Sequence, residues 1–213
     1  MKEPREERGM KYSGVYWNLL HKSFENVLTQ KYDRAFARDL LKDSKKYYRQ
    51  FILDFPDIGA DNPLKDMFYL GCIFISIWKT ADGVISVDSM KTIVISVLEK
   101  FRGLFGLVNL NKKWAKNRLY REGEKFLAWQ ERNTGKYQLE WKAKIEQKEK
   151  GYAYTFLRCP FHEFCTQQGY AEILPVLCSM DFLLIEMMHG KLYREFTCGT
   201  GDYCDFWICG DKE

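Results

Sequence analysis

Residues 134–160, TGKYQLEWKAKIEQKEKGYAYTFLRCP, mark the point where the hydrophobic pattern of the chain changes its period. From Tyr137 to Glu146 apolar and polar side chains alternate, which predicts a strand with one wet face. The turn sequence ending at Gly151 leads into a second strand over residues 152–159, which Pro160 ends. This stretch therefore predicts a β-hairpin.

The chain before this hairpin has the apolar spacing of helices. We expect helices over residues 15–28, 31–51, 64–80, 87–101 and 111–132, after a loose lead-in over residues 1–11. A Pro-, Gly- and Asp-rich break over residues 54–62 separates the second helix from the third, and Ser86 is a plausible N-cap for the fourth.

The chain after the hairpin is expected to return to helices and then to a second hairpin. A short helix runs to Gln168, with Gly169 as its C-cap, and a longer one runs to His189 with Pro175 in its first turn. Strands follow over residues 191–198 and 203–209. The fold class is α+β: one domain over residues 1–213, mainly helical over 1–134, with a small antiparallel sheet of two β-hairpins separated by a helical pair over 135–213.

Composition and charge narrow the classes of function. The net charge is +4, and the basic residues are interleaved with acidic ones, so we expect no nucleic-acid partner. No apolar run reaches the roughly 18–20 residues of a membrane span. Residues 1–9 lack the apolar core of a secretory signal, which favours a cytoplasmic protein with reduced thiols. Aromatic residues make up 16% and could also cover a homo-oligomer interface.

Six of the seven cysteines lie between residues 152 and 209, together with two of the three histidines. Thiols, imidazoles and carboxylates act as nucleophiles, proton carriers and metal ligands. Asp181 stands in an apolar helical stripe, where an unpaired carboxylate would be costly. Cys178, near the start of that helix, is expected to have a lowered pKa. The sequence predicts one site with these candidate catalytic residues: Cys159, Cys178, Asp181 and Cys204.

Three motifs carry a family resemblance. Arg158-Cys159-Pro160, then Cys178-x-x-Asp181, then Gly201-x-x-Cys204-Asp205-Phe206 are similar to the L-2-amino-thiazoline-4-carboxylic acid hydrolase family, over roughly residues 60–209. Asn62-Pro63-Leu64 and Gly190-Lys191-Leu192 fit the same outline. The resemblance implies hydrolytic opening of a 2-amino-thiazoline ring towards carbamoyl-cysteine, with a small-molecule substrate.

The residues can be fitted to that chemistry in more than one way. In the first, the thiolate of Cys178 or Cys159 attacks the amidine-like carbon, and no cofactor is required. Residues expected to contact the substrate are Arg158, which could pair with its carboxylate, His162, Asp205 and Phe206. In the second, zinc held by the same four candidate residues, or with His162, activates water. A third alternative is a non-catalytic sensor with a Cys-rich pocket for a small molecule or metal.

Overall fold

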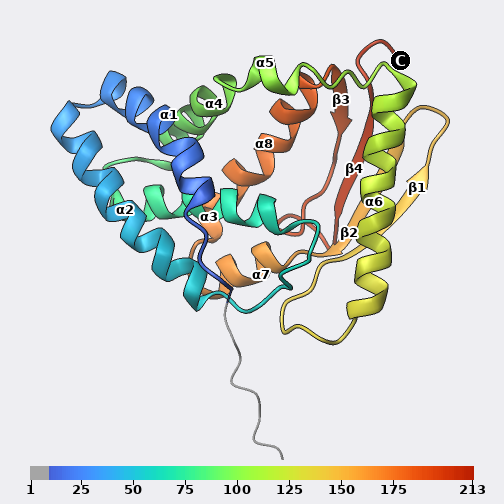
Figure 1. Ribbon diagram of the computed structural model, residues 1–213, viewed down its shortest axis with the longest axis horizontal. Helices are drawn as coiled ribbons and strands as arrows, with labels where there is room; N and C mark the ends of the chain where they lie inside the picture. The colour runs from blue at the N-terminus through green and yellow to red at the C-terminus, as the bar shows by residue number, and fades with distance from the viewer. Residues whose placement is uncertain (1–9) are drawn as a thin grey trace, which may run out of the picture.

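The computed structural model describes residues 10–213, so the expected lead-in over residues 1–11 lies outside the described residues as far as Gly9. The described part has an α+β fold, as predicted, in which the helices α1–α4 form one side and the sheet the other (Figure 1). Its elements are α1 (Val15–Lys31), α2 (Arg34–Asp54), α3 (Lys65–Thr80), α4 (Val87–Glu99), α5 (Arg102–Phe105), α6 (Lys113–Asn133), β1 (Lys142–Gln147), β2 (Tyr152–Arg158), α7 (Pro160–Gln167), η1 (Ala171–Ile173), α8 (Leu174–Met187), β3 (Gly190–Tyr193) and β4 (Cys204–Gly210).

The helical part forms where the apolar pattern predicted it, with capping residues at several ends. Asp33 caps α2 by accepting the Phe36 N–H, and Ser86 caps α4 by accepting the Ser89 N–H, as expected. The most apolar of these helices, α3, is buried along most of its length. Its side chains join those of α1, α2, α4 and α8 in one continuous core.

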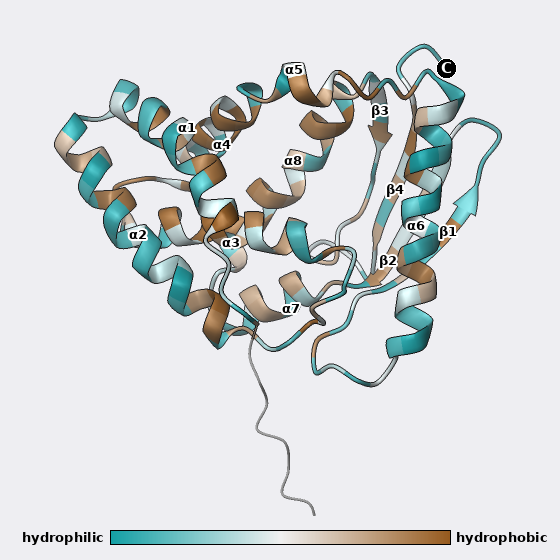
Figure 2. Cartoon of the chain, viewed as in Figure 1, coloured by the Kyte–Doolittle hydropathy of each residue, from teal (hydrophilic) through white to brown (hydrophobic). Residues whose placement is uncertain are grey.

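The sheet is antiparallel throughout, in the order β1-β2-β4-β3. The two predicted hairpins are therefore joined edge to edge through β2 and β4. Helices α6 and α8 cover one face: Ile145 and Tyr154 meet Gly123 of α6, and Ile208 packs with Ile185 of α8. In Figure 2, α8 is drawn largely in the colours of apolar residues and α6 largely in those of polar ones, as their different degrees of burial require.

Two strands are shorter than predicted. The alternation from Tyr137 correctly identified the buried side chains, because Leu139, Trp141 and Ala143 are all buried. Strand pairing nevertheless begins only at Lys142, where the register with β2 shifts. The side chain of Gln130 on α6 bonds the N–H and the carbonyl of Ala143, at 2.6 and 3.3 Å. The alternation from Tyr137 to Trp141 therefore identifies side chains that pack in the core, although these residues are not paired in the sheet.

The third strand ends at Tyr193 instead of residue 198. The carboxylate of Asp205 accepts the backbone N–H groups of Glu195 and Phe196, at distances between 2.6 and 3.2 Å. A side chain thus takes the donors that a strand would offer to its neighbour, and the chain leaves the sheet as a loop.

The segment between the hairpins consists of α7, η1 and α8. Gly169 follows α7 with a φ of +76°, in agreement with its predicted role as C-cap, and Pro175 lies in the first turn of α8. Contacts between α8 and β3 bring the N-terminal half of α8 against the loop that follows β3. No helix within residues 10–213 is both long and apolar enough to cross a membrane.

Candidate active site

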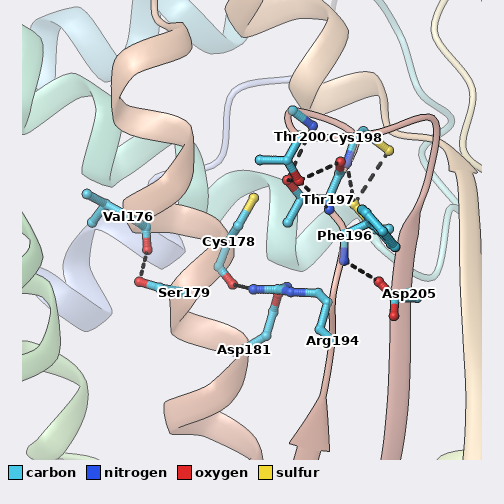
Figure 3. A network of polar contacts seen from close by, with 12 residues as sticks. Val176, Cys178, Ser179, Asp181, Arg194, Phe196, Thr197, Cys198, Thr200 and Asp205 are labelled. Carbon is cyan, nitrogen blue, oxygen red and sulfur yellow. Dashed lines mark hydrogen bonds and ion pairs between the residues drawn. The ribbon is translucent and has the colours of Figure 1, made fainter.

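The predicted catalytic residues come from three separate segments of the chain. Cys159 is the residue between β2 and α7, Cys178 and Asp181 lie on α8, and Cys204 begins β4. Burial raises the pKa of the Cys178 thiol most, and the nearby Asp181, Cys159 and Cys204 raise it further, so these groups lie close enough to affect its ionisation. Figure 3 shows the Cys178 sulfur pointing toward the loop of Thr197 and Cys198.

Asp181 has the partner that its apolar surroundings require. Nη1 of Arg194 donates to its carboxylate at 2.8 Å, and Nη2 of the same guanidinium donates to the Cys178 carbonyl at 2.5 Å (Figure 3). Burial raises the pKa of Asp181 to about 6, although the positive charge of Arg194 and its hydrogen bond act in the opposite direction. The carboxyl group can therefore exchange a proton near neutral pH.

Arg194 was missed by the sequence interpretation, which placed it in the middle of a strand. Its side chain is only 6% exposed. The guanidinium carbon lies 4.7 Å from the ring centroid of Phe182 and 5.0 Å from that of Phe206, so the cation is held between two aromatic rings. The sequence did contain one signal, because an aspartate in an apolar stripe predicts a cationic partner. The strand pattern expected over residues 191–198 did not show that this partner is Arg194.

Cys198 and Cys204 form a hydrogen-bonded thiol pair, of which only Cys204 was predicted as a site residue. The backbone N–H of Cys198 donates to Cys204 Sγ over 2.9 Å, and the two sulfurs are 3.4 Å apart. The Cys198 thiol and N–H lower the pKa of Cys204 to about 7, with Arg194 contributing, and the pKa of Cys198 is raised. Cys204 is consequently the thiol that ionises first.

The predicted lowering of the pKa of Cys178 is wrong. Burial raises the pKa of the Cys178 thiol to about 12, and the neighbouring carboxylate and thiols add to this effect. Burial likewise raises the pKa of Cys159 to about 11, although the backbone amides of His162 and Phe161 favour its thiolate. The favourable end of a helix dipole is outweighed by loss of hydration at both positions.

The residues predicted to contact substrate have different surroundings. The guanidinium of Arg158 donates from Nε and Nη2 to both carboxylate oxygens of Glu163, at 2.5 and 2.8 Å, and its side chain is 42% exposed. His162 on α7 is half-buried beside the β3–β4 loop, since a Cβ atom on Gly199 would lie 3.7 Å from its Nε2.

Asp205 and Phe206 separate onto the two faces of β4. The Asp205 carboxylate is occupied by the loop amides described above, which gives it a structural role in shaping the segment of Arg194 and Cys198. Phe206 covers the Arg194 guanidinium and makes an edge contact with Phe156, at a centroid distance of 5.5 Å. Phe206 therefore forms a wall of the site, whereas Asp205 supports it from behind.

Within residues 10–213, no group of three or more His, Cys, Asp or Glu side chains is placed so that it could hold a metal ion. The Asp181 carboxylate is bonded to Arg194, and Cys204 accepts from Cys198. Two surface hollows of about 270 Å³ lie elsewhere, one beside Trp78 and Glu172 and the other between α1 and α2.

Fold and site together define an α+β protein with a half-buried cluster of thiols beside a carboxylate–guanidinium pair. Comparison with family models identifies the family. The model described as L-2-amino-thiazoline-4-carboxylic acid hydrolase matches residues 67–208, and the chain belongs to that family. The matched region runs from within α3 to within β4 and includes every residue of the cluster. Comparisons with curated proteins and with solved structures found no match.

Proposed function

We propose that this protein is a hydrolase that opens a 2-amino-thiazoline-4-carboxylate ring, with Cys204 as the nucleophile. The observations that carry the proposal are that Cys204 Sγ accepts the N–H of Cys198 at 2.9 Å and lies 3.4 Å from Cys198 Sγ. They favour a thiolate at neutral pH, beside the positive charge of Arg194. Membership of the family supplies the substrate class.

The electrophile is the ring carbon bonded to the sulfur and to two nitrogens. The Cys204 thiolate adds to this carbon, and the tetrahedral adduct collapses by breaking the bond from the carbon to the ring sulfur. The ring opens and its sulfur departs as a thiolate, a better leaving group than an amine anion. The product of this half-reaction is an isothiouronium group attached to Cys204.

Water completes the reaction. It adds to the isothiouronium carbon, and the carbon–sulfur bond to Cys204 breaks as the carbonyl forms. One proton of the water passes to the Asp181 carboxylate and the other to the sulfur released from the ring, which gives carbamoyl-cysteine and the free Cys204 thiolate. A carboxyl group with a pKa near 6 suits this acceptor role, because it is mostly ionised at neutral pH.

In this proposal, other residues of the cluster bind the substrate or hold the reacting side chains in position. Arg194 fixes Asp181 by its hydrogen bond and keeps the aromatic wall of Phe206 in place. His162, which is half-buried, and the exposed part of Arg158 would bind the substrate carboxylate. Cys159 and Cys178 remain protonated, because burial raises the pKa of both thiols. No step is assigned to zinc.

The experiment is turnover of L-2-amino-thiazoline-4-carboxylate, followed by detection of carbamoyl-cysteine. We expect Cys204→Ser to lower kcat/KM by roughly 10³-fold or more. Cys209→Ser on the same strand lies outside the cluster and is the matched control, for which activity should persist. Full activity of Cys204→Ser would remove the nucleophile assignment. Binding of the thiazoline by the wild type without turnover would favour the non-catalytic sensor.

A further inference from the structure

The thiol pair has a second property that hydrolysis does not use. The two sulfurs, 3.4 Å apart, must approach by roughly 1.4 Å to reach the length of a disulfide bond, about 2.05 Å. Cys198 Sγ is also 3.7 Å from the carbonyl oxygen of Phe156, a weak contact that a thiol can leave. The pair is therefore close to the geometry of a disulfide before any rearrangement.

The segment between the two cysteines can absorb this movement. All five intervening residues, 199–203, are exposed and include two glycines. Their turn is held by hydrogen bonds between Thr197 and Thr200, which do not involve the core. Since no buried side chain lies in this segment, closing the sulfurs together costs little packing.

We propose that Cys198 and Cys204 form a redox dithiol site that reacts with hydroperoxides and closes to a disulfide. The Cys204 thiolate attacks one peroxide oxygen, the O–O bond breaks, and the other oxygen takes up a proton and departs as water, or as an alcohol when the hydroperoxide is organic. The Cys204 sulfenic acid is then attacked by the Cys198 thiol, the S–O bond breaks, and water leaves as the S–S bond forms. The two thiols lose two protons and two electrons, and the peroxide takes them up.

Cys198 is the resolving thiol because it is in direct contact with Cys204. Cys159 and Cys178 influence the ionisation of Cys198 and so lie in the same cluster, but the direct hydrogen bond to Cys204 comes from Cys198. Cys72 and Cys165 lie in the core without exposed surface. A peroxide from solvent can therefore reach the pair, through the partly exposed Cys198, more easily than it can reach Cys72 or Cys165.

The disulfide would also regulate the proposed hydrolase. Only this effect on turnover rests on the proposed function; formation of the disulfide does not. A disulfide removes the thiolate that would attack the ring, so oxidation would switch hydrolysis off and reduction would restore it. The resolving thiol would also protect Cys204 from irreversible oxidation to the sulfinic acid. Formation of the bond can be measured without any substrate.

The experiment treats the full chain with one equivalent of hydrogen peroxide, blocks remaining thiols with N-ethylmaleimide, and maps the protein under non-reducing conditions. Chymotrypsin cleaves after Tyr203, which separates the two cysteines unless a disulfide joins them. We expect the intact mass, measured before the thiols are blocked, to fall by two hydrogens. The map should show Cys198 joined to Cys204, and dithiothreitol should reverse the change.

Three variants make the assignment specific. Cys198→Ser should lose the disulfide and instead gain oxygen atoms at Cys204, whereas Cys178→Ser should still close the pair. The thermal unfolding of each variant before oxidation checks that it is folded, and Cys198→Ala repeats the test with a smaller side chain. Joining of Cys204 to Cys159 or Cys178, or unchanged oxidation in Cys198→Ser, would overturn the proposal. A disulfide that forms without loss of turnover would leave the dithiol site intact and count against Cys204 as the nucleophile.

Discussion

The guanidinium of Arg194 donates to the carboxylate of Asp181 over 2.8 Å, and this pair links the helix α8 to the loop that carries Cys198. The two residues are thirteen positions apart, on opposite sides of β3. A second donation from Arg194, to the Cys178 carbonyl, doubles the connection. The position of the whole thiol cluster therefore depends on one buried cation.

Replacement of Arg194 by Met should leave Asp181 without its partner. We expect the free energy of unfolding to fall by about 3 kcal/mol, the cost of breaking a buried ion pair from one side. Denaturant titration measures the loss, and Arg102→Met, at an exposed ion pair with Glu99, is the control that should change little. An Arg194→Met variant as stable as the wild type would contradict the structural role. Asp181→Asn in the same chain should recover part of the loss.

The pKa of Asp181 predicts how stability varies with pH. Because burial raises it from 3.8 to about 6, the folded protein holds this proton more tightly than the unfolded chain does between those pH values. The contribution of Asp181 to stability is thus fully present at the acid end and is lost as the pH rises to about 6, by up to ~3 kcal/mol.

The measurement is the difference in unfolding free energy between the wild type and Asp181→Asn across that range. It should decline with rising pH, because asparagine does not titrate. A difference that grows with pH would show that the Arg194 cation dominates over burial.

Gly151 should be intolerant of a side chain. Its φ is +78°, and a Cβ atom there would lie 1.9 Å from the Ile208 carbonyl oxygen, so Gly151→Ala must displace β4 from β2. Gly135 has nearly the same φ, +77°, with no atom within 4 Å of a Cβ, and is the matched control. We expect about 1 kcal/mol for Gly135→Ala from backbone conformation alone, and a clearly larger loss for Gly151→Ala. Equal losses in thermal unfolding would mean that the close approach is unimportant.

Removal of metal should leave turnover unchanged, because the proposed steps use only side chains of the chain and water. Protein purified without a tag should contain less than about half an equivalent of any transition metal and keep its activity in chelator. Loss of activity in chelator, with recovery on addition of zinc, would favour the metal-activated water considered from the sequence.

Much of the fold could be predicted because the apolar period changes sharply at residues 134–160 and because caps such as Ser86 and Gly169 mark helix ends. The strand limits could not, because side chains replaced backbone partners. At the end of β3, the carboxylate of Asp205 accepts the N–H groups of Glu195 and Phe196. Such long-range side-chain contacts leave no periodic signal.

The candidate site was partly predictable for a related reason. The cost of a buried carboxylate singled out Asp181, and the motifs singled out Cys204. The order of thiol acidity was not predictable, because it depends on which sulfur accepts hydrogen bonds. Cys178 has the helix terminus but is dehydrated, whereas Cys204 accepts from Cys198. Arg194 and Cys198 acquire their importance only from the loop that Asp205 shapes.

Titration of the thiolate absorbance in the ultraviolet tests the central claim most directly, since it reports ionisation without substrate. The wild type should show one thiolate appearing with a pKa of about 7, which Cys204→Ser lacks and which moves upward in Cys198→Ala. Absence of any thiolate near neutral pH, or an unchanged titration in Cys204→Ser, would contradict the account.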